Sequence, residues 1–185
     1  MADPVILKTP RLVLRPPMPD DAAEITERIG VKAVVWNLGR APYPYALSDA
    51  EAWVEKVPQG WVEDTAYVFV LTRTDDGVIG CVGLDHKPGD VWELGYWLGE
   101  PWWGVGYITE AAAAVMHWAE SEMGFTRFAA GHFVDNPASG KVLTKLGFEP
   151  VGEKDMYGRA RDAMTPALRY TKGTDPDLAL SLAAH

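Results

Sequence analysis

The sequence is poor in residues that build disulfides, metal clusters and nucleic-acid surfaces. Cys81 is the only cysteine among 185 residues, which excludes a disulfide within the chain and a cysteine metal cluster. Histidine and cysteine residues lack the spacing of a metal site, so we expect no metal. The net charge of −9 argues against nucleic acid or an anionic membrane as the main partner. These absences favour a reducing compartment and a cationic partner.

Long apolar runs are also missing. No stretch approaches the length of a transmembrane helix and no signal peptide precedes Arg11, so we expect a cytoplasmic protein. A length of 185 residues with 48% apolar residues fits one well-buried domain. We place this domain at residues 1–172 and a peripheral tail at 173–185. The sequence leaves open whether the protein is a monomer or a homodimer.

Periodicity and turn residues predict one strand, two helices, three antiparallel strands, and then helix, strand, helix, strand. The expected strands cover residues 9–16, 66–73, 78–85, 91–98, 127–134 and 163–171, and the expected helices cover 21–30, 48–57, 108–123 and 136–146. Hairpins occupy the middle of the chain and crossovers come only afterwards. The fold class is therefore α/β in the α+β sense, with a mixed sheet and helices on both faces, and it is neither doubly wound nor a barrel.

Two smaller features accompany this pattern. Acidic capping pairs, Asp21 with Glu24 and Ser48 with Glu51, are expected to open the first two helices. The aromatic segment 36–45, which also contains proline and glycine, is either a packed surface loop or part of a substrate wall.

The most informative stretch runs from Trp97 to Gly124. It predicts the end of a strand, then a loop with Gly104 and Gly106, and then an amphipathic helix. The first turn of a helix leaves backbone N–H groups unpaired, and glycines let a bulky anion approach them. Neither a dinucleotide fingerprint nor a P-loop fits, because position 109 is Thr109 and Gly-Lys-Ser/Thr does not occur. A phosphate or pyrophosphate is the expected guest.

Two segments together carry a family resemblance: GYWLGEPWWGVGYITEAAAAV at 95–115 and VDNPASGKVLTKLGFEPVG at 134–152. They resemble the Gcn5-related N-acetyltransferase (GNAT) superfamily and, within it, the RimJ/RimL-like ribosomal-protein alanine N-acetyltransferases. The opening TPRLVLRPPMPDDAAEI at 9–25 resembles the same branch. The resemblance implies a GNAT-like acyl-CoA N-acyltransferase fold with a strongly twisted central sheet, and acetyl-CoA as co-substrate.

The resemblance also implies a cofactor site. In that family the pyrophosphate of acetyl-CoA sits on the amides of a loop written Gln/Arg-x-x-Gly-x-Gly/Ala. Here both glycines match, while Pro101 replaces the leading residue. The residues implied to bind the cofactor are Trp97, Leu98, Gly99, Trp103, Gly104, Val105, Gly106, Tyr107, Ile108, Asn136 and Ser139. Asn136 is expected to cap its helix as well.

The catalytic residues are less sharply indicated. Many relatives carry a tyrosine, as acid to the leaving thiolate, where this sequence has Leu143, so the resemblance makes Ser139 the candidate that hydrogen-bonds the thiolate. Glu93, on the strand that leads into the loop, is the first candidate for the general base. Asp135 and His132 are second candidates, and a water chain is the remaining alternative.

We therefore expect an acetyl-CoA-dependent N-acetyltransferase in which a primary amine attacks the thioester directly. A protein N-terminal α-amine suits a weak base better than a lysine, because a pKa near 8 leaves about a tenth of it neutral at pH 7. The alternatives are an enzyme for a small amine, such as an antibiotic or a polyamine, and a non-catalytic acyl-CoA-binding module. Cys81 lies within a strand, so we expect a buried structural thiol and no acyl-enzyme.

Overall fold

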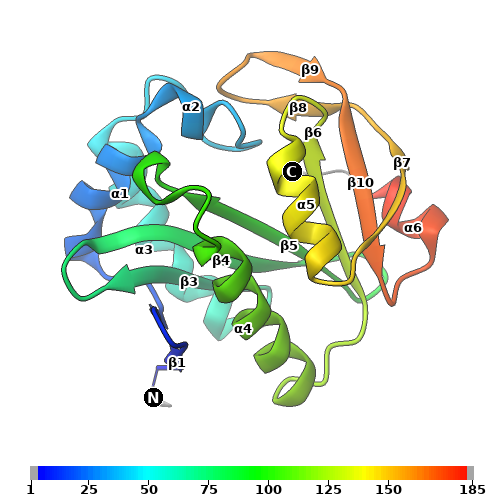
Figure 1. Cartoon of the computed structure of the whole chain (residues 1–185), viewed down its shortest axis with the longest axis horizontal. Helices are drawn as coiled ribbons and strands as arrows, with labels where there is room; N and C mark the ends of the chain where they lie inside the picture. The colour runs from blue at the N-terminus through cyan, green and yellow to red at the C-terminus, as the bar shows by residue number, and fades with distance from the viewer. Residues whose placement is uncertain (1–3, 183–185) are drawn as a thin grey trace.

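The computed structural model describes residues 4–182 and contains an eight-stranded mixed sheet with helices on both faces (Figure 1). The strands are β1 (Leu7–Lys8), β2 (Val13–Arg15), β3 (Ala66–Arg73), β4 (Gly77–Lys87), β5 (Val91–Leu98), β6 (Phe128–Phe133), β7 (Glu149–Glu153), β8 (Met156–Gly158), β9 (Ala163–Thr165) and β10 (Ala167–Lys172). The helices are η1 (Pro19–Asp21), α1 (Ala22–Ile29), α2 (Lys32–Val35), α3 (Leu47–Val62), η2 (Glu100–Trp102), α4 (Tyr107–Ser121), α5 (Pro137–Lys145) and α6 (Pro176–Ser181). The sheet order is β1-β2-β3-β4-β5-β6-β10-β7, and β8 and β9 form a separate hairpin.

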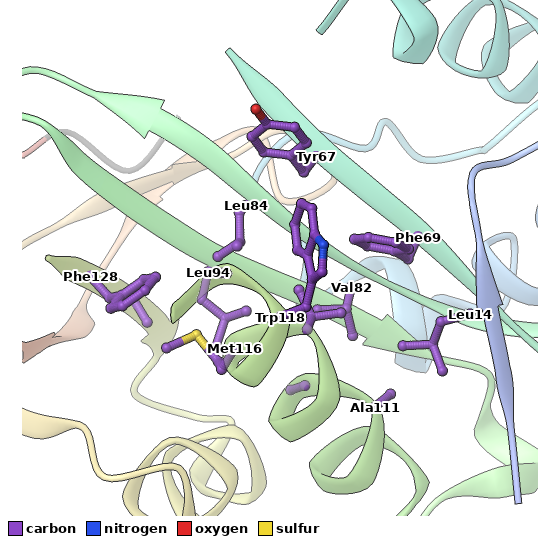
Figure 2. Packing of buried hydrophobic residues seen from close by; sticks show 14 of the residues in the cluster. Leu14, Tyr67, Phe69, Val82, Leu84, Leu94, Ala111, Met116, Trp118 and Phe128 are labelled. Carbon is purple, nitrogen blue, oxygen red and sulfur yellow. The ribbon is translucent and has the colours of Figure 1, made fainter. Parts of the chain in front are cut away.

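Two apolar layers hold the helices to the sheet. The larger cluster packs α4 and Leu143 of α5 on one face, and Trp118 of α4 lies among Phe69, Leu84 and Leu94 (Figure 2). The other face carries α1 and α3, and the small cluster beneath α6 lies further along it. Trp118 is 7% exposed and its ring lies 5.4 Å from that of Phe69 in an edge-to-face contact. The expected fold class is confirmed.

The middle of the chain follows the sequence closely. The strands expected at 66–73 and 91–98 have those bounds, and the Asp-Gly turn between β3 and β4 has Gly77 at a φ of 65°. The connection from β5 to β6 runs through α4 and makes the two strands parallel, as its length predicted. Gly124 and Gly147, each expected to follow a helix, both have positive φ.

The N-terminal predictions need correction. Of the strand expected at 9–16 only β2 forms, and β1 lies in the segment before it, because the Thr9 N–H donates to the Leu12 carbonyl and closes a turn between β1 and β2. The helix expected to end near residue 57 continues to Val62 with Pro58 inside it.

Neither predicted capping pair forms. The Asp21 carboxylate accepts hydrogen bonds from Arg15 at 2.7 Å, and that of Glu24 accepts one from the Val78 N–H at 2.6 Å. In α3 the Asp49 carboxylate accepts from the Ala46 N–H at 2.9 Å, so that helix starts before Ser48. An ion pair with Arg15 and a hydrogen bond from β4 override the local pattern at the first helix start, and a neighbouring acid overrides it at the second.

The C-terminal part holds more structure than expected. The strand predicted at 163–171 is β9 and β10, and β7 and β8 precede them. The described part of the tail is not peripheral, since Ala179 of α6 is fully buried against Val91 and Ala129. Within residues 4–182, no helix combines the length and apolar character needed to cross a membrane.

A splay at the centre of the sheet positions the site. β5 and β6 pair only where Trp92–Leu94 faces Phe128–Ala130. Beyond Leu94 the two strands separate, and β5 keeps its partner β4 on the other side as far as Leu98. The backbone edge of β5 that faces β6 is therefore unpaired by a strand from Gly95 onward.

Candidate active site

A cavity of about 420 Å³ lies at the splay between β5 and β6. It is bounded by the last residues of β5, by the glycine loop with the start of α4, by α5, and by Val34, Asn37 and Leu38 near α2. Nine of the residues predicted to bind the cofactor line it: Trp97, Leu98, Trp103, Gly104, Gly106, Tyr107, Ile108, Asn136 and Ser139. The structure thus brings together residues from two motifs more than 25 positions apart.

The start of α4 is open toward this cavity. Gly104 and Gly106 have φ angles of 79° and 86°, which favour glycine, and an added Cβ at Gly104 would meet nothing within 4 Å. Gly106 is the N-cap and supplies no side-chain cap. The Glu110 N–H donates to the Gly106 carbonyl at 3.1 Å, so the amides of Tyr107, Ile108 and Thr109 have no intrahelical acceptor. Such a turn suits an anion.

Two predicted cofactor residues do not line the cavity. A Cβ at Gly99 would lie 2.7 Å from the Trp102 ring, so this glycine serves close packing. The Val105 side chain is exposed, and its carbonyl accepts a hydrogen bond from Arg11 Nη1 at 2.9 Å. Trp103 Nε1 donates to the Leu98 carbonyl at 2.7 Å and fastens the loop to the end of β5.

The negative charge of Glu110, in the first turn of α4, is neutralised by the N-terminal segment. Its carboxylate accepts hydrogen bonds from Thr9 Oγ1 and Arg11 Nε, both at 2.6 Å. Burial by itself would raise the pKa of Glu110, but the hydrogen bonds from Thr9 and Arg11 outweigh it and lower that pKa. Arg11 Nη2 lies 3.6 Å from a Cβ position at Gly106, and the guanidinium stands 4.4 Å from the Tyr107 ring centroid. The site therefore has an arginine beside its loop although Pro101 replaces the family's leading residue.

Ser139 lies in the first turn of α5, opposite β5. The Asn136 side chain accepts from the Ser139 N–H at 3.4 Å, which confirms the predicted cap. Ser139 Oγ is 2.8 Å from the hydroxyl of Tyr96, another residue of the lining. Leu143 is 1% exposed in the core, so that position contributes only packing. Sequence reasoning missed Tyr96, although its alternation with Leu94 and Leu98 places it on the face toward α4 and α5.

Glu93 is held in a buried ion-pair cluster. Its side chain is 9% exposed, with Arg169 Nη2 at 2.8 Å and Lys87 Nζ at 3.2 Å from the carboxylate oxygens. Period two does place Glu93 on the face of Gly95 and Trp97, but Glu93 is not part of the cavity lining. Both carboxylate oxygens face cations, so the geometry gives the predicted base role no direct support, and that role stays a prediction.

The second candidates for the base are also engaged. Asp135 forms a two-point ion pair with Arg161 at 2.8 and 2.9 Å, and these hydrogen bonds lower its pKa. His132 lines the cavity, but its Nδ1 lies 2.7 Å from the Phe133 carbonyl and its Nε2 lies 3.2 Å from the Tyr170 hydroxyl. Since the Phe133 carbonyl can only accept, Nδ1 is the donor of that contact, and the Tyr170 hydroxyl occupies the Nε2 side of the ring.

The described cavity lining contains no aspartate or glutamate. Cys81 is buried in β4, and burial raises the pKa of its thiol, which is unsuited to a nucleophile. In residues 4–182, no group of three or more His, Cys, Asp or Glu side chains could hold a metal ion. The polar groups of the lining are thus backbone amides and carbonyls, hydroxyl groups, an imidazole, side-chain amides and lysine cations.

The segment around α2 forms the far wall of the cavity. Asn37 and Leu38 belong to the aromatic segment singled out in the sequence, which therefore contributes to the wall. The β8–β9 hairpin is tied to this segment, since Arg161 Nε donates to the Trp36 carbonyl at 2.8 Å and the Arg159 N–H donates to that of Gly39 at 2.9 Å.

The splayed mixed sheet, the open helix start and the cavity between them are the architecture of an acetyltransferase. The family model described as "Acetyltransferase (GNAT) domain" matches residues 11–149, and the chain belongs to this family. It is an acetyltransferase enzyme of the GNAT type, as expected from the resemblance.

Relatives extend this assignment. The chain is 29% identical over 163 residues to an uncharacterized N-acetyltransferase of Schizosaccharomyces pombe, covering 80% of this chain and 86% of the relative. It is 34% identical over 88 residues to the [ribosomal protein uS5]-alanine N-acetyltransferase of Escherichia coli K12, covering 45% and 43%. Among solved structures, RimL, a ribosomal L7/L12 alpha-N-protein acetyltransferase in complex with coenzyme A, shares the fold. Its TM-score is 0.80 at 17% identity, covering 92% of this chain and all of that one.

Proposed function

We propose that the protein is an acetyl-CoA-dependent N-acetyltransferase that transfers the acetyl group to a primary amine by direct attack. The observation that carries this proposal is the cavity at the β5–β6 splay, which ends at the open N-terminus of α4. Solved relatives of this fold are described as complexes with coenzyme A or acetyl-CoA. The non-catalytic acyl-CoA-binding module is not favoured, because the chain belongs to an acetyltransferase family.

The residues present fit acetyl-CoA. The amides of Tyr107, Ile108 and Thr109 would hold the pyrophosphate, and Gly104 and Gly106 leave room for it. Arg11 would add a cation next to those amides and remove the opposing charge of Glu110. The free edge of β5 beyond Leu94 would offer backbone groups to the pantetheine arm in the manner of an added strand.

Two lysines of α5, Lys141 and Lys145, also line the cavity and add positive charge to it. Ser139 would donate a hydrogen bond to the departing thiolate. A thiol pKa of about 8.5 means that the leaving group needs no strong acid near neutral pH.

The acceptor is an amine that must be neutral to attack. No described carboxylate lines the cavity, so a water chain would have to connect any carboxylate base, Glu93 included, to that amine. This arrangement suits an acceptor that loses its proton easily. An α-amine with a pKa near 8 meets that need better than a lysine with a pKa near 10.4.

We therefore propose a protein N-terminal α-amine as the preferred acceptor. Two relatives named for acetylating ribosomal-protein alanine and serine support this choice, although each covers only part of the chain. A small amine is the second candidate, and the same reaction chemistry would serve it.

The cofactor site is tested by calorimetry of coenzyme A binding to Gly106→Asp. This change adds bulk and negative charge at the proposed phosphate site, so binding should weaken at least a hundredfold. Gly124→Asp is the matched control, because Gly124 also has positive φ, at 69°, and an open Cβ position, but lies at the other end of α4. Equal affinity of the two variants would move the phosphate site elsewhere.

The acceptor is tested by measuring thiol release from acetyl-CoA with a panel of N-terminal peptides, blocked-terminus lysine peptides and small amines, and by mass spectrometry of the products. Faster acetylation of the lysine peptides would refute the α-amine preference. Turnover of small amines alone would replace the protein acceptor by the second candidate.

A further inference from the structure

A hydrogen-bonded pair of hydroxyl groups bridges the two walls of the cavity. Tyr96 Oη lies 2.8 Å from Ser139 Oγ and 3.1 Å from the Ser139 carbonyl oxygen. Tyr96 comes from β5 and Ser139 from the first turn of α5, and both line the cavity. The pair stands just beyond Leu94, the last residue of β5 that pairs with β6.

The local structure fixes both partners of this pair. Alternation along β5 turns Tyr96 to the face of Leu94 and Leu98, toward α4 and α5. The Asn136 cap orients the first turn of α5 and with it Ser139. Leu143 is buried one turn further along α5, so α5 itself brings no phenol into the cavity. The phenol that contacts Ser139 comes instead from β5.

We infer that Tyr96 is a positioning residue. Its single hydroxyl proton can reach the Ser139 carbonyl at 3.1 Å or Ser139 Oγ at 2.8 Å, and by donating to the nearer oxygen, Oγ, it leaves the Ser139 hydroxyl proton free to point at the leaving sulfur. This inference rests on the proposed function, in which Ser139 faces the thiolate. A hydroxyl that accepts one hydrogen bond becomes a stronger donor of another, because chains of hydrogen bonds polarise one another. Tyr96 would thus stabilise charge that develops on a sulfur it does not touch.

The reaction balances without a proton from the pair. The amine nitrogen forms a bond to the acetyl carbon, the C–S bond breaks with its electron pair on sulfur, and the nitrogen proton passes to solvent. Burial raises the pKa of Tyr96 to about 12, although its hydrogen bond with Ser139 acts in the opposite direction. Since a thiol has a pKa of about 8.5, the phenol keeps its proton while the thiolate leaves.

The test is the pKa of the coenzyme A thiol when bound, followed by the ultraviolet absorbance of the thiolate. In the unchanged protein this pKa should lie below that of free coenzyme A. Tyr96→Phe should raise it by about one unit, and Ser139→Ala by at least as much. The double variant should match Ser139→Ala alone, because Tyr96 acts through Ser139. Affinity for desulfo-coenzyme A, which lacks the sulfur, should be the same in all four proteins.

Tyr45→Phe is the matched control for loss of a buried phenol. Burial also raises the pKa of Tyr45 to about 12, but its ring packs against the α1–α3 cluster and does not line the cavity. This variant should leave the bound thiol pKa unchanged. In turnover, Tyr96→Phe should lower kcat by about tenfold with little change in the KM for acetyl-CoA, as expected for an interaction made in the transition state.

The outcomes distinguish a failure of the proposed function from a failure of the role inferred for Tyr96. If coenzyme A does not bind the unchanged protein, the proposed function fails. If coenzyme A binds and Tyr96→Phe leaves the thiol pKa unchanged, the inference is overturned. Additive effects of the two substitutions would also overturn it, since Tyr96 would then act independently of Ser139. If Tyr96→Phe lowers the affinity for desulfo-coenzyme A as much as the affinity for coenzyme A, Tyr96 serves only to pack the site, and the inference is also overturned.

Discussion

The substitution Glu93→Gln should destabilise the protein strongly, whatever its effect on catalysis. Among the described residues, Glu93 is the single anion paired with Arg169 and Lys87, and all three side chains are at most 10% exposed. Arg169 Nε already lacks a hydrogen-bond partner within the described structure. Glutamine would keep an acceptor but would leave two buried cations without a counter-charge. Removing one partner of a buried ion pair costs about 3–5 kcal/mol, a large share of a typical domain stability of about 5–15 kcal/mol.

Urea denaturation at neutral pH measures this cost. Glu120→Gln is the matched control, because it removes the same charge from the surface ion pair with Lys172, where the side chains are 41% and 31% exposed. That change should cost less than about 1 kcal/mol. Adding Lys87→Met to Glu93→Gln removes the surplus cation and should restore part of the lost stability.

Two results would contradict this reasoning. A loss no larger than that of Glu120→Gln would show that the cluster contributes little to stability. A failure of Lys87→Met to restore stability would show that the surplus cation is not the cause of the loss. The same variants test the catalytic hypothesis, provided that the measurements are made on folded protein. If Glu93 is the base, Glu93→Gln lowers kcat/KM most below the α-amine pKa and raising the pH recovers part of the loss. If the cluster is structural, the pH profile keeps its shape.

The remaining predictions concern Arg11 and the acceptor. Arg11→Gln should weaken coenzyme A binding by roughly tenfold in calorimetry. The change removes a cation and leaves the negative charge of Glu110 unpaired beside the amides that would hold the phosphate. Adding Glu110→Gln to this variant should therefore recover part of the lost affinity. Because the folded-state pKa of Glu110 is lowered, its stabilising contribution is present above about pH 4.3 and is lost as the pH falls through that folded-state pKa. Arg11→Gln should therefore destabilise the protein at pH 7 and much less at strongly acidic pH, as thermal unfolding would reveal. For an N-terminal peptide, kcat/KM should rise with pH and level off near 8, whereas a lysine peptide should still gain rate above pH 9.

Local patterns sufficed for several segments whose neighbours in sequence are also their neighbours in space. The hairpin β3–β4, the strand β5, the glycine loop and the Asn136 cap all depend on short-range rules, and the structure has them. The residues proposed to bind the cofactor could be grouped for the same reason, and nine of them line one cavity. Most of them lie in a single stretch around Gly104 and Gly106.

Partners that come from distant segments could not be read from the sequence. Arg11 reaches Glu110 across 99 positions, and Glu93 meets Arg169 across 76. The period-two alternation of β5 correctly placed Glu93 on one face of the strand, but it does not predict the two cations that contact its carboxylate. The capping pair of Asp21 and Glu24 failed because Arg15, six positions away, binds the Asp21 carboxylate and the distant Val78 N–H binds that of Glu24.

The pairing of Tyr96 with Ser139 is also a contact between distant segments that the sequence could not predict. It joins residues 43 positions apart, and it exists because β5 and β6 separate after Leu94 and leave a strand side chain facing a helix start. Neither of the carboxylates Glu93 and Asp135 is part of the cavity lining. On the proposed function, the site therefore assists the leaving group through hydroxyl groups and gives the amine little direct help. Such a division of labour makes the acceptor's own pKa decide which amine reacts. An α-amine and a lysine differ by more than two pKa units, equivalent to about 3 kcal/mol for losing the proton, and a cavity without a carboxylate does nothing to close that gap.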